Sequence, residues 1–214
     1  MDLRRFLDGR GGQLGFLTYQ HASLVIQCVV IGVVIALAIA ALVYRSRAGA
    51  AFATAVASVG MTVPSLALLA LLLIVFGLGV TPSVTMLAFY ATLPILTSAI
   101  VGLQAVPPAL VEAARGLGMP RWRVLATVEL PNAWPVILTG IRVSTQLVVG
   151  VATVVAYVLG PGLGSLIFSG LARLGGAGAL ESALVGTVLV VAVALVLDGL
   201  LVLLGRLTVS KGLR

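Results

Sequence analysis

The side chains that could do chemistry in this chain are few, and they fall in two places. Only 9% of the 214 residues are charged, and there is one histidine and one cysteine. Charged residues gather between residues 106 and 134, and two more, Arg142 and Asp198, lie inside long apolar runs. There is no nucleophile with an adjacent base, no group of metal ligands and no phosphate loop ending in Gly-Lys-Ser/Thr. We therefore predict no catalytic residue, no metal site and no ATP hydrolysis by this chain.

The segment 106–134 is typical of two short helices joined at a glycine. It contains Glu112-Ala-Ala-Arg-Gly-Leu-Gly118-Met-Pro-Arg-Trp-Arg123 and continues to Val128-Glu-Leu-Pro131. Gly118 is a usual helix stop, and a second helix can begin near Pro120, because proline is tolerated in a first turn. The pattern predicts a protruding knob on which Ala113 and Ala114 leave a flat patch that another protein can approach closely.

Three roles are open for Glu112. It could cap the loop, pair with Arg115 three residues later, or contact another protein. We favour an internal structural role, because a single exposed ion pair contributes only about 0–1 kcal/mol. Arg121 and Arg123 follow in the second short helix.

The remainder of the chain has the composition of a protein that lies in lipid. Hydrophobic residues make up 61% of it and charged residues 9%, whereas a soluble domain carries about 25% charged residues. A helix needs about 20 apolar residues to cross a hydrocarbon core about 30 Å thick. Charge-poor runs predict spans near residues 22–44, 53–76, 83–103, 134–158 and 183–205. The runs are continuous rather than alternating, which favours helices over barrel strands.

The predicted fold is therefore an all-α polytopic membrane bundle of about five transmembrane helices. We divide the chain into an amino-terminal interfacial segment, 1–21, a membrane domain, 22–205, and a tail, 206–214. Residues 160–181 are rich in glycine and are expected to form an external loop or a re-entrant piece. The first apolar run is long enough to span and is followed by Tyr44-Arg-Ser-Arg47, so we expect no cleaved signal peptide, with cleavage inside that run as a minor alternative.

Basic residues predict the orientation. The net charge is +7, but the basic side chains lie at span ends rather than in one patch, so we exclude nucleic acid as a partner. Basic loops stay in the cytoplasm. Eight basic residues fall on the side of the 106–134 loop and four on the other: Arg45, Arg47, Arg115, Arg121, Arg123, Arg206, Lys211 and Arg214 against Arg4, Arg5, Arg10 and Arg173. We predict an amino terminus outside and a carboxyl terminus in the cytoplasm.

Prolines and polar residues inside the spans are candidates for a transport pathway. Pro64 and Pro94 each remove a backbone hydrogen bond and bend a helix, and neighbours or water must satisfy the freed carbonyl. A bent helix lining a pathway and an ordinary packing kink are both open, with Thr62 and Ser65 beside the break at Pro64. The expected pathway residues are Gln27, Ser58, Thr62, Ser65, Ser144, Thr145, Gln146, Thr153 and Tyr157. Serine and threonine also hold membrane helices together, so packing remains an alternative.

Arg142 and Asp198 are charges placed inside spans. At about 1.5 Å per residue, both lie about 10–12 Å from the cytoplasmic ends of their helices. Lone intramembrane charges are costly and usually paired, so we predict an ion pair or a shared polar cluster. The alternative is that each reaches the interface separately. We expect His21, at the outer edge of the first span, to be interfacial rather than a metal ligand.

The 106–134 loop resembles the signature of a known family. Glu-Ala-Ala, three residues, Gly, nine residues, an aliphatic residue, one residue and Leu-Pro is the signature loop of the permeases of ATP-binding cassette (ABC) importers. The matching positions are Glu112, Ala113, Ala114, Gly118, Val128, Leu130 and Pro131, with valine where isoleucine is commoner. Three more segments look like permeases for glycine betaine, choline and carnitine: Met61-Thr-Val-Pro-Ser-Leu-Ala-Leu-Leu-Ala70, Tyr90-Ala-Thr-Leu-Pro-Ile95, and Gly150-Val-Ala-Thr153 followed by Gly162-Leu-Gly164.

The resemblance implies a MetI-like fold in the bacterial plasma (inner) membrane and uptake of small quaternary-amine osmoprotectants. It implies that the loop, Arg115, Arg121 and Arg123 included, forms a coupling helix that docks into a groove of a cytoplasmic ABC ATPase. The expected partners are two ATPase subunits, a second permease of the same or a related chain, an extracytoplasmic substrate-binding protein and membrane lipid. No cofactor is expected on this chain, because ATP and Mg belong to the ATPase.

Three other functions stay open. The cargo could be methionine or another small solute. A secondary transporter or channel working without an ATPase would need intramembrane ion-coupling acids and an inverted repeat, but only Asp198 qualifies and no repeat is visible. The chain could also be a purely structural membrane subunit of a larger complex.

Overall fold

The structure, a computed structural model, describes residues 6–158 and 160–209 and is helical throughout, with no strand in that part of the chain. This confirms the all-α prediction. The long helices are α2 (Gly11–Val43), α3 (Arg47–Thr62), α5 (Val80–Gln104), α8 (Leu130–Val155) and α10 (Ala179–Thr208). The shorter ones are α4 (Ser65–Phe76), α6 (Pro108–Gly116), α7 (Arg121–Val124), the π-helix η1 (Leu125–Glu129), the 3₁₀ helix η2 (Ala156–Val158) and α9 (Gly164–Leu171).

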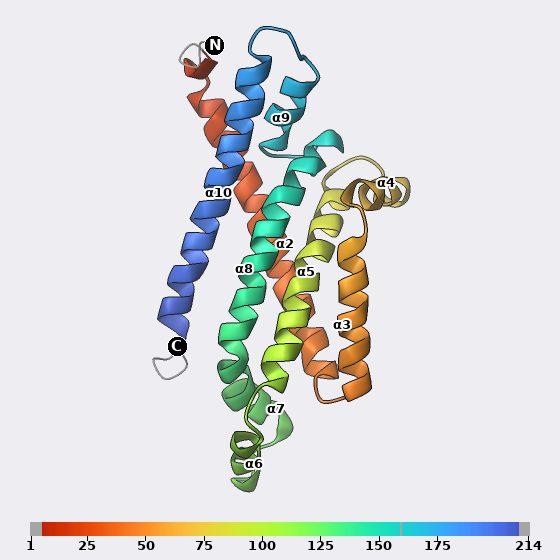
Figure 1. Cartoon of the computed structure of the whole chain (residues 1–214), viewed down its shortest axis with the longest axis vertical. Helices are drawn as coiled ribbons and strands as arrows, with labels where there is room; N and C mark the ends of the chain where they lie inside the picture. Colours follow the sequence, from red (N-terminus) through yellow and green to blue (C-terminus); the bar gives the residue numbers. More distant parts are fainter. Residues whose placement is uncertain (1–5, 159, 210–214) are drawn as a thin grey trace.

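The five long helices run back and forth between the two ends of an elongated bundle (Figure 1). One end carries α6, α7, the turn between α2 and α3 and the end of α10. The opposite end carries the start of α2, the crosswise helix α4 and α9. The 106–134 loop and the end of α10 therefore lie on one side, and the start of α2 lies on the other.

The helices long and apolar enough to cross a membrane number four in the described residues: Gly11–Val43, Val80–Gln104, Arg121–Val158 and Ala179–Thr208. A fifth span is possible if α3 and α4, bent by 96°, count as one. These agree with the predicted spans, with the second one broken. Helix α2 begins at Gly11, so residues 11–21 continue the first span where the sequence predicted a separate interfacial segment over 1–21. Most of the predicted tail, residues 210–214, lies outside the described residues.

The break in the second span is centred on proline. Val63 and Pro64 have extended backbone conformations between α3 and α4. The Tyr90 hydroxyl on α5 donates a hydrogen bond to the Val63 carbonyl, which supplies the neighbouring partner that a broken membrane helix needs. Pro94, in contrast, leaves α5 continuous. The two prolines therefore differ: one ends a helix and the other is accommodated within one.

Small residues let the central helix α5 approach both neighbours closely. A Cβ added at Gly32 of α2 would lie 2.6 Å from the Ala91 Cβ, and one added at Gly140 of α8 would lie 2.5 Å from the Ser98 side chain. The Ser144 hydroxyl donates to the Ala91 carbonyl over 2.8 Å. Because lipid tails are as apolar as leucine, such close packing and interhelical hydrogen bonding hold membrane helices together. This contact fixes α8, on which several candidate site residues lie.

The end of the bundle that carries the start of α2 corrects one prediction. His21 was expected at the membrane interface, but it is fully buried and its Nε2 lies 3.2 Å from the Val149 carbonyl of α8. The turn at Gly162 covers it so closely that a Cβ there would lie 2.9 Å from the His21 Nδ1. The glycine-rich segment that follows, predicted as an external loop or a re-entrant piece, contains the short helix α9, which packs against α10 (Figure 1).

Candidate functional site

The 106–134 loop forms the helical knob that the sequence predicts, and it projects beyond the ends of the long helices (Figure 1). Helix α6 ends in a Schellman motif, in which the Met119 N–H bonds to the Ala114 carbonyl and the Gly118 N–H to the Arg115 carbonyl. Gly118 has φ +78°, a left-handed conformation that glycine adopts without steric cost. The chain then turns at Pro120 into α7. Gly118 therefore sets the angle between α6 and α7.

The outer surface of the knob is mostly the predicted one. Glu112, Ala113, Arg115, Arg121 and Arg123 are exposed. Ala114 is only 5% exposed, because the side of α6 that carries it packs towards α7 and η1. The prediction that both alanines form an approach patch is therefore wrong for Ala114.

Glu112 also differs from the prediction. Within the described residues its carboxylate makes no ion pair with Arg115, and α6 has no side-chain cap. The favoured internal role is wrong, since an exposed carboxylate without an internal partner is available to a second protein. Two large side chains that the sequence analysis did not single out lie on the same surface, Leu117 and Trp122, which are 79% and 67% exposed. For Trp122 the available signal in the sequence was its position between two arginines.

The loop returns to the bundle through a π-helical turn, η1. Leu130 begins α8 and packs against the hydrophobic core, and Pro131 is the second residue of α8, directly after the π turn. The residue between the motif positions Val128 and Leu130 is Glu129, which is 4% exposed. The π turn, a rare feature that often marks functional sites, thus places a carboxylate inside the protein.

Glu129 lies in a polar cluster that the sequence analysis missed. The Tyr44 hydroxyl and the Arg45 Nη2 donate to its Oε2 over 2.5 and 3.0 Å. The Gln104 Nε2, at the end of α5, donates to the Tyr44 carbonyl over 2.9 Å. The available signal was an acid placed where the loop re-enters the apolar region, opposite the Tyr-Arg pair that ends the first span.

A second candidate region is a stripe of polar and small residues along α8 and into η2. Its members recur at intervals of three and four, which places them on one face of a helix: Thr139, Arg142, Gln146, Gly150, Thr153 and Tyr157. Each is exposed or half-buried in the single chain. Thr153 bonds to its own helix, and Tyr157 packs edge-on against Phe168 of α9. The face that α8 turns away from α5 is therefore polar along its length.

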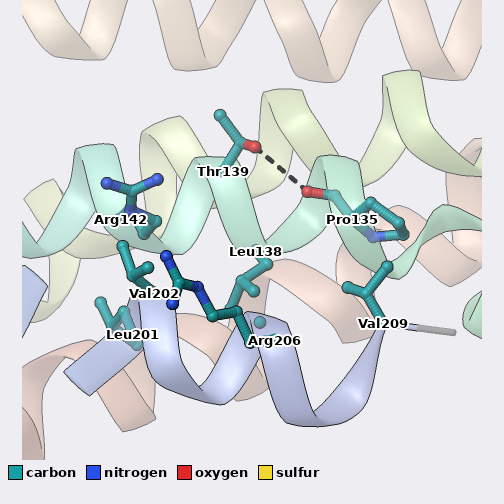
Figure 2. A pocket seen from close by; sticks show the side chains of 9 residues that line it. Pro135, Leu138, Thr139, Arg142, Leu201, Val202, Arg206 and Val209 are labelled. Atoms are coloured by element: carbon teal, nitrogen blue, oxygen red, sulfur yellow. Dashed lines mark hydrogen bonds between the residues drawn. The ribbon is translucent and has the colours of Figure 1, made fainter. Parts of the chain in front are cut away.

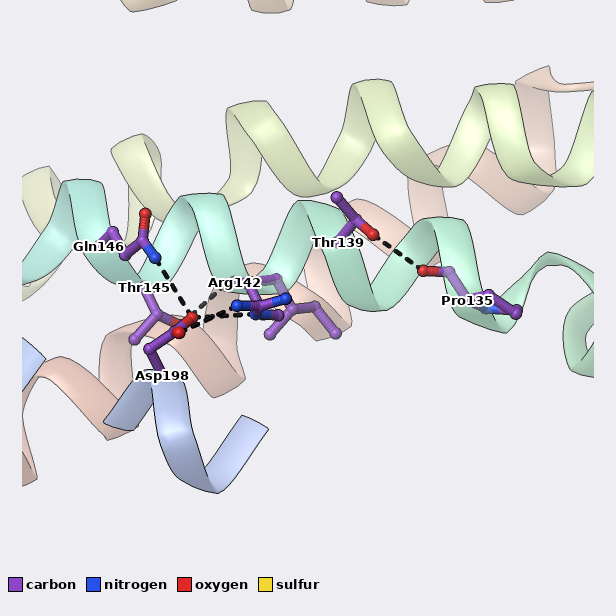
Figure 3. Close-up of polar contacts among 7 residues, drawn as sticks. Pro135, Thr139, Arg142, Thr145, Gln146 and Asp198 are labelled. Carbon is purple, nitrogen blue, oxygen red and sulfur yellow. Dashed lines mark hydrogen bonds and ion pairs between the residues drawn. The ribbon is translucent and has the colours of Figure 1, made fainter. Parts of the chain in front are cut away.

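Asp198 of α10 meets this stripe near its middle. The Arg142 Nε and Nη2 donate to the two carboxylate oxygens over 2.9 Å each, and the Gln146 Nε2 donates to Oδ1 over 3.2 Å (Figure 3). The side chains of Arg142 and Asp198 are 39% and 24% exposed. The structure thus brings together the two intramembrane charges as a bidentate pair, with Gln146 as a third member.

A groove of about 260 Å³ lies between α8 and α10 on the knob side of this pair. Figure 2 shows Arg142 and Arg206 beside it, and Pro135 and Thr139 along its α8 wall. Below it, the Trp134 indole N–H donates to the Thr208 hydroxyl over 2.8 Å. Polar contacts therefore link α8 to α10 at two positions along their length.

The other predicted pathway residues do not form one surface. Thr62, Pro64 and Ser65 lie at the break between α3 and α4, and the Thr62 hydroxyl bonds to its own helix at Val59. Ser144 and Thr145 point into the core and satisfy backbone carbonyls there. The predicted pathway thus divides into a group on α8 and a group at the α3–α4 break, while Ser144 and Thr145 serve packing. Gln27 and Ser58 lie apart from both groups, on α2 and in the middle of α3.

Known proteins match nearly the whole chain. The model of the family described as "Binding-protein-dependent transport system inner membrane component" matches residues 29–209. The glycine betaine/carnitine/choline transport system permease protein OpuCB of Bacillus subtilis is 34% identical over 98% of this chain and 94% of its own length. The carnitine transport permease protein OpuCB of Listeria monocytogenes is 39% identical over 78% of this chain and 76% of its own. A solved chain of the MetNI methionine ABC transporter, 22% identical, shares the fold with a TM-score of 0.71 over 87% of this chain and 92% of that one.

Proposed function

The chain belongs to the family of binding-protein-dependent transport system inner membrane components, and from this premise we propose that it carries quaternary-amine osmoprotectants into a bacterial cell. Glycine betaine, choline or carnitine would be the cargo, because the relatives that cover most of the chain are permeases for these compounds. The chain would be the permease subunit of an ABC importer, with ATP and Mg used by its partner ATPase. The observation that carries the proposal is the exposed helical knob with its full signature sequence.

The knob has the properties of a docking surface for an ATPase. It projects from the bundle, and it combines large apolar side chains with Glu112, Arg115, Arg121 and Arg123. The apolar contacts supply affinity, and the charges supply orientation. The Schellman turn at Gly118 makes α6 and α7 a defined two-helix unit rather than a flexible loop. Two ATPase subunits would bind two such knobs, one from each of two permeases.

The proposed orientation follows from the positive-inside rule applied to the fold. Arg45, Arg47, the knob arginines and Arg206 gather at one end of the bundle, which would be cytoplasmic. The start of α2, α4 and α9 would face the extracytoplasmic binding protein that delivers substrate. The amino terminus would lie outside and the carboxyl terminus inside.

The polar stripe of α8 is the proposed wall of the pathway. Left against lipid, Arg142, Asp198 and Gln146 would be costly, so a water-filled path between two permeases is the environment that suits them. Gln146, Thr153 and Tyr157 would line it on one side, and the broken segment at Thr62, Pro64 and Ser65 would contribute from α3 and α4. We expect no tight site in this chain, since quaternary ammonium groups favour aromatic cages and selectivity would rest with the binding protein.

Two alternatives are less well supported. Methionine cargo rests on a solved relative at 22% identity, a similarity that supports the fold alone. A secondary transporter needs a carboxylate free to bind an ion, whereas Asp198, the intramembrane acid of the predicted spans, accepts bonds from Arg142 and Gln146.

The test is purification from membranes in mild detergent, followed by reconstitution into liposomes with the co-purifying ATPase and binding protein. We expect an ABC ATPase to co-purify and ATP to drive uptake of radiolabelled betaine, choline or carnitine but not methionine. Methionine uptake would replace the proposed cargo. Uptake without any ATPase would refute the assignment.

A further inference from the structure

The buried carboxylate of Glu129 connects the knob to two separate parts of the bundle. We propose that Glu129 is a positioning residue that makes α3 and α8 move together when the knob is displaced, through its bonds to Tyr44 and Arg45. The inference rests on the proposed function, since it concerns how force from an ATPase would reach the pathway. The signature motif assigns no such role, because it specifies no residue at position 129, between Val128 and Leu130.

Geometry makes the contact a junction rather than a local ion pair. Glu129 ends the π turn at the base of α8, whereas Tyr44 and Arg45 are consecutive residues in the turn between α2 and α3. Two donors from the same short turn therefore bond to one carboxylate oxygen of Glu129. The turn is held from its other side by Gln104 of α5, which bonds to the Tyr44 carbonyl. The Glu129 carboxylate, which is 4% exposed, thus links the base of α8 to the α2–α3 turn, and Gln104 links that turn to α5.

Burial makes this junction rigid. A carboxylate removed from water needs hydrogen-bond and charge partners, and losing one costs far more than losing an exposed pair. Arg45 supplies the charge and Tyr44 a short hydrogen bond. The knob therefore cannot separate from the α2–α3 turn without leaving the Glu129 charge uncompensated.

The π turn sets the direction of Glu129. The Leu130 N–H bonds back to the Leu125 carbonyl, five residues earlier, so the helix gains one residue in this turn. In an α-helix each residue advances about 100°. Without the extra residue, Glu129 would be turned by about that angle, away from Tyr44 and Arg45. The sequence therefore forms an uncommon helix at the point where the carboxylate has to point inward.

The turn that carries Tyr44 and Arg45 is also connected to the start of α3. The Ser46 hydroxyl caps α3 by accepting from the Gly49 N–H over 3.1 Å, directly after Arg45. Helix α3 then extends for 16 residues, about 24 Å at about 1.5 Å per residue, to Thr62 and the break at Pro64. Glu129 is itself the residue before α8, which carries the polar stripe. One carboxylate thus ties together the bases of the two helices that carry the two groups of predicted pathway residues.

The experiment compares Glu129→Gln and Tyr44→Phe in the reconstituted complex of permease, ATPase and binding protein. Each substitution preserves shape and removes a charge or a hydroxyl. Glu181→Gln, at the opposite end of the bundle, is the matched control for loss of an acid. The readout is substrate transported per ATP hydrolysed, which a purely structural role would not change in the complexes that assemble.

We expect Glu129→Gln to lower this ratio on the order of tenfold, because bonds to a charged group are strong. Tyr44→Phe should lower it less, the double variant should be no worse than Glu129→Gln, and Glu181→Gln should match wild type. A ratio equal to that of the control overturns the proposal, as does a parallel loss of hydrolysis and transport. If Glu129→Gln fails to assemble, an unchanged ratio for Tyr44→Phe decides against it. Failure of the proposed function would already appear as absent ATP-driven uptake in the wild-type complex.

Discussion

The ion pair between Arg142 and Asp198 should be measurable as a coupling energy. Either alanine substitution leaves one charge of a bidentate pair without its partner inside the membrane region. An unpaired arginine or aspartate at membrane depth costs about 2.5–3.5 kcal/mol on insertion scales. The side chains are 39% and 24% exposed in the single chain, so part of each charge can be solvated. We therefore expect each single variant to lose about 2 kcal/mol of stability.

The double variant removes both charges and leaves none uncompensated. It should lose less than the sum of the two single losses, by about 2 kcal/mol, which is a typical interaction energy for residues in direct contact. The assay is equilibrium unfolding in bicelles of Arg142→Ala, Asp198→Ala and the double variant. Gln146→Ala serves as a milder comparison, because it removes one bond to Asp198 and no charge. Additive losses would refute the reasoning, since they would mean that each charge reaches water independently.

Substitutions at four further positions test other parts of the fold. Gly118→Val should reduce co-purification of the ATPase on the order of tenfold in pull-down, because φ +78° costs a β-carbon residue about 1–2 kcal/mol, while Gly118→Asn should be milder. Tyr90→Phe should lower stability by about 1–2 kcal/mol in bicelle unfolding, because the Val63 carbonyl at the helix break loses its donor. Gly140→Leu should destabilise by about 1–3 kcal/mol, since a Cβ would already lie 2.5 Å from Ser98, whereas Gly150→Leu, with nothing within 4 Å, should keep its stability and slow uptake.

The helices and their order could be predicted because they depend on one-dimensional quantities. Charge-poor stretches longer than the hydrocarbon core predict the spans, and Gly118 followed two residues later by Pro120 predicts the shape of the knob. The break at Pro64 could be located but not sized, since the 96° bend depends on whether a neighbour satisfies the freed carbonyl. That neighbour is Tyr90, 27 residues further along the chain. Pro94 is also a proline, yet helix α5 continues through it without a break, unlike the second span at Pro64.

Burial of polar residues was the part that the sequence could not give. His21 looks interfacial because it stands at the edge of an apolar run, yet a glycine turn from the other half of the chain covers it. In the sequence, Glu129 looks like another acidic residue of the loop. Its buried position depends on a π turn, which no residue pattern predicts. Arg142 and Asp198 are the contrasting case. An unpaired charge in lipid is costly, so each of the two is predicted to have a partner. Because both residues lie at about the same depth, few other charged residues can serve as that partner.

The contacts of α8 explain how a chain without reactive groups could do mechanical work. Glu129 ties its base to the α2–α3 turn, and Arg142 ties its middle to α10. Its face opposite the polar stripe packs on α5 through Gly140 and Ser144, so α8 is held at its base, at its middle and along that face. A packed interior transmits displacement because it resists compression. A push on the knob should therefore move α8 as a rod, and the polar face that it carries would move relative to a second permease rather than deform.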